Sequence, residues 1–198
     1  MSENVLNQGV DAGRLEAFSD GVLAIIITIM VLEIHHPEDS GELSEFFGQK
    51  MVPVLLAYLL SFIFVGNYWN NHHHLLKATK RINGGVMWAN LHLLFWLSLI
   101  PILTGWLGVN HTASGPAALY GIVGAMCGFS YVILQQTIKK ANPDVDSRIF
   151  STTDIKGGIS TGLNVLAIGA AFISPWISYA LFVAVAIMWF VPSKKLVS

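Results

Sequence analysis

The sequence predicts an all-α integral membrane protein with six membrane-spanning helices. Of its 198 residues, 54% are hydrophobic and only 12% are charged, and the mean hydropathy is +0.59. Soluble domains carry about 25% charged residues, so this composition excludes an ordinary soluble protein. No basic tract points to nucleic acid, and no segment is long and polar enough for a soluble domain. We therefore expect residues 1–198 to form a single membrane domain.

Six apolar stretches are long enough to cross a bilayer, which takes about 20 mostly apolar residues. The first is preceded by acidic residues instead of a basic stretch, and no small-residue cleavage site follows it, so we interpret it as a retained span and not as a signal peptide. The expected spans are residues 18–35, 52–71, 85–107, 115–138, 155–173 and 175–192.

Prolines and small residues indicate how these spans begin and pack. Pro53, Pro116 and Pro175 lie near the starts of the second, fourth and sixth spans, where a missing amide proton costs nothing. Pro101 lies inside the third span and predicts a kink. Glycine, serine, threonine and asparagine fill the first half of the fifth span. Because small residues allow close helix packing, we expect the fifth span to be buried.

The basic residues predict the orientation. Of the 11 Lys and Arg residues, only Lys50 falls on one side of the six spans, and the other ten fall on the side that holds both termini. Cytoplasmic loops carry an excess of Lys and Arg, so both termini are expected in the cytoplasm. The loop after the first span is acidic, with Glu38, Asp39, Glu42 and Glu45 on the outer side.

The first span carries one hydroxyl in a run of apolar residues. On a helix, Ile25, Ile29 and Leu32 lie on one face, and Thr28 lies beside them. By pattern alone such a stripe is typical of helix packing, and a lone threonine commonly bonds the carbonyl four residues back.

A group of polar residues opens the same span, where an unpaired charge is expensive. The group comprises Arg14, Glu16, Ser19 and Asp20, and Arg14 with Asp20 is one possible pair. The second span returns to the same membrane level, so a polar network that locks the first helix to the second is expected. The segment GNYWNNHHHLLK offers Trp69, Asn70, His72, His73 and His74 as partners.

The octapeptide RLEAFSDG, residues 14–21, resembles the arginine-x-x-x-Phe-Ser-Asp signature that opens the first helix of the transmembrane protein 175 family, lysosomal potassium channels and their bacterial relatives. The apolar pattern after it and the Trp and His residues that end the second span are also similar to the bacterial members. The resemblance implies a homotetramer in a bacterial inner membrane, because one chain carries one signature.

The resemblance also implies a potassium channel with a pore lined by the first helix. By position, Ile25, Ile29 and Leu32 form the constriction, and Thr28 matches a threonine whose hydroxyl favours potassium. The matching structural network comprises Arg14, Phe18, Ser19 and Asp20 with Trp69, His72 and His73, although which histidine matches is open in the HHH run.

These residues suggest a mechanism without a carbonyl filter, because no TVGYG loop is present. Apolar rings supply no oxygen ligands to a permeating ion. Potassium holds its water less tightly than sodium, so such rings favour potassium. The Thr28 hydroxyls replace part of the lost coordination of the ion. The same rings would block conduction by dewetting. Glu33 and the acidic loop attract cations. Permeating potassium ions are expected, and no cofactor.

Two other classes of protein are alternatives to a potassium channel. Three consecutive histidines point about 100° apart on a helix and cannot close on one metal ion, so neither a metal site nor an enzyme is expected. The second alternative is a secondary transporter that uses polar groups of the third and fifth spans, although no carboxylate sits mid-membrane to couple protons. Its candidate residues are Asn90, His92, Ser98 and Asn164.

Overall fold

A computed structural model describes residues 12–34, 51–145 and 148–190, with only the backbone path given for 148–154. Every regular element within these ranges is a helix. The acidic residues expected at 38–45 lie outside the described residues. The helices are α1 (Ala12–Leu32), α3 (Met51–Lys77), α4 (Gly84–Ser98), α5 (Ile100–Val109), α6 (Ser114–Ala141), α7 (Arg148–Ala171) and α8 (Pro175–Phe190).

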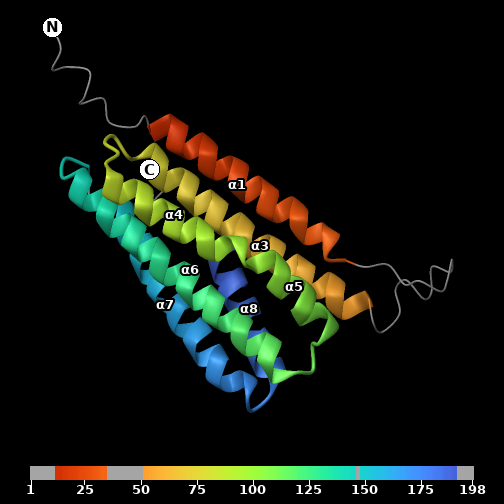
Figure 1. The fold of residues 1–198 in the computed structure, drawn as a ribbon. Helices are drawn as coiled ribbons and strands as arrows, with labels where there is room; N and C mark the ends of the chain where they lie inside the picture. Colours follow the sequence, from red (N-terminus) through yellow and green to blue (C-terminus); the bar gives the residue numbers. More distant parts are fainter. Residues whose placement is uncertain (1–11, 35–50, 146–147, 191–198) are drawn as a thin grey trace, which may run out of the picture.

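The helices form one bundle with α1 along an edge (Figure 1). There α1 packs on α3, α4 and α5, while α6 contacts α4, α5, α7 and α8. Four stretches are long and apolar enough to cross a membrane: α1, α3, α4 with α5 (Gly84–Val109), and α6. With α7 and the shorter apolar α8, they confirm the predicted six-helix membrane architecture.

The third crossing is interrupted where the sequence predicts a kink. α4 ends at Ser98 and α5 begins at Ile100, with Leu99 between them. Pro101 has no amide proton, so it cannot make the i to i−4 hydrogen bond that would carry the helix smoothly through this turn. The Leu103 amide still donates to the Leu99 carbonyl at 3.3 Å, and the two segments remain one crossing.

The prediction that the small residues of 155–173 pack closely is wrong in part. Gly158 and Gly162 of α7 are exposed, and a Cβ added at either would meet no atom within 4 Å. The close approach instead uses glycines of α6. A Cβ on Gly124 would lie 2.6 Å from Asn164 Oδ1, which forces a shift. Glycine on α6 therefore makes room for polar side chains of α7.

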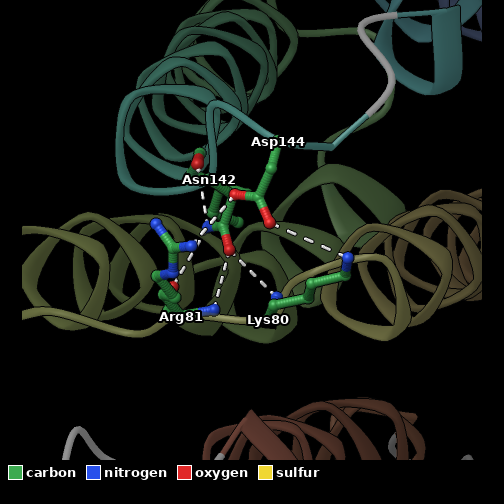
Figure 2. Close-up of polar contacts among 5 residues, drawn as sticks. Lys80, Arg81, Asn142 and Asp144 are labelled. Carbon is green, nitrogen blue, oxygen red and sulfur yellow. Dashed lines mark hydrogen bonds and ion pairs between the residues drawn. The ribbon is translucent and has the colours of Figure 1, made fainter.

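A buried asparagine fastens the α3–α4 connection to the end of α6 (Figure 2). Asn142 Oδ1 accepts hydrogen bonds from the backbone amides of Lys80 at 3.0 Å and Arg81 at 2.7 Å. Its Nδ2 donates to the Arg81 carbonyl at 3.1 Å. Asp144 adds ion pairs to the side chains of Lys80, at 3.8 Å, and Arg81, at 3.4 Å. These contacts hold the end of α3, which faces the start of α1.

Candidate functional site in the first helix

The two faces of α1 have opposite environments within the subunit. Its buried face repeats every three or four residues and consists of Leu15, Ser19, Leu23, Ile26 and Met30. Its opposite face carries the predicted apolar stripe: Ile25 is 57%, Ile29 41% and Leu32 72% exposed. Large apolar side chains on that face are therefore left uncovered by the described residues of the subunit.

Thr28 lies on the exposed face and hydrogen-bonds its own helix. Its hydroxyl lies 3.1 Å from the Ala24 carbonyl oxygen and 3.0 Å from the Ile25 carbonyl oxygen. A threonine hydroxyl has one hydrogen to donate and two lone pairs to accept with. Since the hydrogen is used toward the helix, the oxygen keeps its acceptor capacity for whatever lies on the exposed side.

A buried hydrogen-bond chain joins the start of α1 to α4 and α3. Asn90 Nδ2 donates to Ser19 Oγ at 2.9 Å, and Ser19 Oγ donates to the Leu15 carbonyl at 2.8 Å. Asn90 Oδ1 lies 2.6 Å from His72 Nε2. Ser19, Asn90 and His72 are all at most 1% exposed. Because unsatisfied buried polar groups are costly, this chain holds three helices in register.

A second set of contacts lies nearer the surface. Trp69 Nε1 donates to Asp20 Oδ1 at 3.0 Å. His73 Nδ1 lies 2.7 Å from Glu16 Oε1, and its ring stacks on that of Trp69 with centroids 5.9 Å apart. His72 therefore contacts Asn90 of α4, and His73 contacts Glu16 of α1. His74 is exposed.

Several predicted members are placed differently. Arg14 is exposed, and no ion pair joins it to Asp20 in the described part of the chain. Phe18 is 52% exposed, so it is not packed into the buried hydrogen-bond chain. Asn90, which the sequence offered as a transporter residue, is the centre of the buried chain. Its only sequence signal was an amide in an apolar span, which commonly links helices.

A third polar group was not foreseen from the sequence. The Thr104 hydroxyl lies 2.8 Å from the Ser61 hydroxyl, which lies 3.1 Å from the Tyr120 hydroxyl. All three side chains are buried, and Met30 Sδ of α1 lies 3.9 Å from Thr104. These contacts join α3, α5 and α6 beneath the buried face of α1 and stiffen its support.

Glu33 lies just beyond the end of α1 and against α5. A Cβ on Gly105 would lie 2.6 Å from Glu33 Oε2, so the glycine leaves room for the carboxylate. The side chain is half-buried. Its carboxylate therefore lies against α5 at the level where α1 ends.

Apart from Asn90, the polar groups proposed for a transporter form hydrogen bonds within their own helices. His92 accepts from Trp96 at 3.0 Å, Ser98 donates to the Phe95 carbonyl at 2.7 Å, and Asn164 donates to the Ser160 carbonyl at 2.9 Å. Asn164 lines a cavity of about 30 Å³, and Asn90, His92 and Ser98 are absent from its lining. The four residues therefore do not share that cavity.

The chain is similar along almost its whole length to named potassium channels. It is 49% identical over 187 residues to a potassium channel from Chryseobacterium sp. (strain P1-3), covering 93% of this chain and 95% of that one. A potassium channel from Streptomyces collinus is 30% identical over 174 residues, covering 83% of this chain and 84% of that one. Together with the helical bundle, these likenesses define a multi-pass membrane cation channel.

More particularly, the chain belongs to the TMEM175 family. Residues 14–101 match the family model described as endosomal/lysosomal potassium channel TMEM175. The crystal structure of a lysosomal potassium-selective channel TMEM175 homolog from Chamaesiphon minutus superposes with a TM-score of 0.76 at 29% identity, covering 90% of this chain and 95% of that one. The human endosomal/lysosomal proton channel TMEM175 is 38% identical over 88 residues, which is 18% of its length.

Proposed function

We propose that this protein is a potassium-selective channel whose pore is lined by α1 from four identical subunits. The observation that carries the proposal is the exposed stripe of Ile25, Thr28, Ile29 and Leu32 on a helix whose other face is fully packed. Around a common axis these side chains form stacked rings. The named potassium channels among its relatives support the same permeant ion.

Selectivity in this proposal comes from the cost of dehydration. Isoleucine and leucine rings offer no oxygen ligand, so an ion keeps part of its water or loses it uncompensated. Potassium holds its water less tightly than sodium, and the apolar rings therefore penalise sodium more. Four Thr28 oxygens, each with an accepting lone pair toward the exposed side, return part of the lost coordination.

The same rings serve as the gate. Hydrophobic constrictions close to ions by expelling water, without contact between the side chains. A small rotation or tilt of α1 changes the width of the rings at Ile25, Ile29 and Leu32. The selectivity zone and the gate are therefore one structure, and the mechanism needs no cofactor and no chemical step.

Charge favours cations over anions at the outer mouth. Glu33 lies at the C-terminal end of α1, where the helix dipole is also negative. Four such ends around one axis raise the local cation concentration.

The proposed membrane is the bacterial inner membrane, with both termini in the cytoplasm. Contacts of Trp69 with Asp20 and of His73 with Glu16 place the end of α3 beside the start of α1. The described basic residues Lys77, Lys80 and Arg81 follow at that same end, which is the arrangement expected of a cytoplasmic face.

Cysteine cross-linking tests the pore-lining role of α1 directly. In a Cys127→Ala background, Ile25→Cys is expected to form disulfide-linked dimers of subunits on mild oxidation, because copies of residue 25 face one another around the axis. The adjacent Ile26→Cys is the matched control, since Ile26 is 4% exposed within its own subunit. Monomers only from Ile25→Cys, with a single-subunit mass in detergent, would overturn the proposal.

Ion flux separates the channel from the transporter. Purified protein in liposomes is expected to pass potassium down its gradient without saturation over the millimolar range. Saturable flux coupled to a second ion would instead support the transporter.

A further inference from the structure

Three metal-ligand side chains meet where α1 and α3 come together. Glu16 and Asp20 are four residues apart on α1, so both project from one face of the helix. His73 comes from α3, and one ligand atom from each of the three residues lies within 4.8 Å of the others. All three side chains are half-buried, so the cluster is open to ions from solution.

The closest contact in the cluster is not an aligned hydrogen bond. His73 Nδ1 lies 2.7 Å from Glu16 Oε1. Even so, this buried nitrogen has no hydrogen-bond partner of acceptable geometry among the described residues. At this separation a cation has to lie between the two atoms: a proton on Nδ1, which makes the contact an ion pair, or a metal ion in its place. A metal ion that replaces the proton would use both atoms as ligands.

Neighbouring groups hold the ligands in place. The His73 ring stacks on Trp69, and Trp69 Nε1 donates to Asp20 Oδ1 at 3.0 Å, which leaves Oδ2 to bind an ion. Partners of this kind, behind the ligands, orient a metal site and tune its affinity. One tryptophan thus orients both the imidazole and a carboxylate.

We propose that Glu16, Asp20 and His73 bind a divalent transition-metal ion of the zinc class. One imidazole and two carboxylates suit Zn²⁺, and two negative charges offset those of the ion. Bond lengths of 2.0–2.1 Å around a tetrahedral ion place ligand atoms roughly 3.3 Å apart, so side-chain shifts of the order of an ångström complete the site. Water takes the fourth position. The nitrogen ligand and low ligand count disfavour Ca²⁺ and Mg²⁺.

The consequence for conduction rests on the proposed function. Two ligands belong to α1 and one to α3, so a bound ion cross-links the proposed pore helix to its support. The bound ion then opposes any opening of the pore that requires α1 to move relative to α3. Zinc at a saturating concentration is expected to lower potassium flux.

Direct binding tests the site independently of conduction. Equilibrium dialysis of the purified protein against ZnCl2, with metal analysis, is expected to give one Zn²⁺ per chain. Glu16→Gln and His73→Gln should each weaken binding by about tenfold or more, the effect typical of disturbing a metal site. His74→Gln is the matched control, because His74 is exposed and supplies no atom to the cluster; its affinity should be unchanged.

Each outcome has a definite meaning. Zinc binding that survives both Glu16→Gln and His73→Gln, or that falls equally in His74→Gln, overturns the site. One equivalent lost only in the first two variants supports it, whether or not the protein conducts. Unchanged flux in wild-type liposomes at a saturating zinc concentration overturns the coupling to α1 alone, whereas a wild type without any potassium flux counts against the proposed channel.

Discussion

The two faces of α1 differ in how they are held. The inner face is fixed by specific hydrogen bonds, with Asn90 bonding both Ser19 and His72. The outer face carries Ile25 and Leu32, which are more than half exposed among the described residues. The inner face therefore stabilises the subunit, whereas the outer face is the one proposed to line the pore.

Substitution of a residue that holds the inner face should cause the largest loss of protein stability. Asn90→Ala removes the donor to Ser19 Oγ, which keeps its own bond to the Leu15 carbonyl, and leaves His72 Nε2 without its buried partner. An unsatisfied buried group costs about 1–3 kcal/mol. We expect a large fall in the unfolding temperature in detergent and poor recovery of assembled protein. Asn70→Ala, at an exposed position of α3, is the control, and equal stability of the two variants would contradict the role of Asn90.

The outer face should affect conduction without a comparable loss of stability. Ile25→Asn places a polar amide in the proposed constriction, which wets it and raises potassium flux several-fold. The same change one residue on, Ile26→Asn, buries an unpartnered amide and should lower stability instead. Liposome flux and thermal unfolding distinguish the two. Unchanged flux in Ile25→Asn would mean that Ile25 faces lipid.

Within the outer face, Thr28 is expected to affect ion selectivity. Thr28→Val keeps the shape and removes the hydroxyl, so the potassium-to-sodium permeability ratio should fall by about twofold, equivalent to a few tenths of a kcal/mol. Reversal potentials in mixed salts measure this ratio. Val31→Thr, also on an exposed part of α1, is a control for adding a hydroxyl elsewhere. An unaltered ratio in Thr28→Val would remove the hydroxyl from the mechanism.

The smallest effect is expected at the edge of the inner face. Trp69→Phe removes the hydrogen bond to the partly exposed Asp20 and keeps an aromatic ring beside His73. Such a bond contributes about 0.5–1.5 kcal/mol, so the unfolding temperature should fall slightly and flux should be retained. A loss as large as that of Asn90→Ala would place Trp69 among the main supports of α1.

Part of this contrast could be predicted from the sequence. The helical spacing of Ile25, Ile29 and Leu32 predicts one shared face, and the structure places them together on it. The sequence alone does not say which neighbour a polar residue meets. The HHH run left the partners of its histidines open. In the structure, His72 lies within hydrogen-bond distance of Asn90, and His73 contacts Glu16.

By itself, the sequence determined that this chain is an all-helical membrane protein of the TMEM175 type, because hydropathy, proline placement and the RLEAFSDG signature are local properties of the chain. Only the tertiary structure decided that Asn90 joins Ser19 to His72, that glycines of α6 make room for α7, and that Glu16, Asp20 and His73 converge. These contacts depend on the rotation and depth of helices far apart in sequence, which side-chain geometry sets when the helices pack.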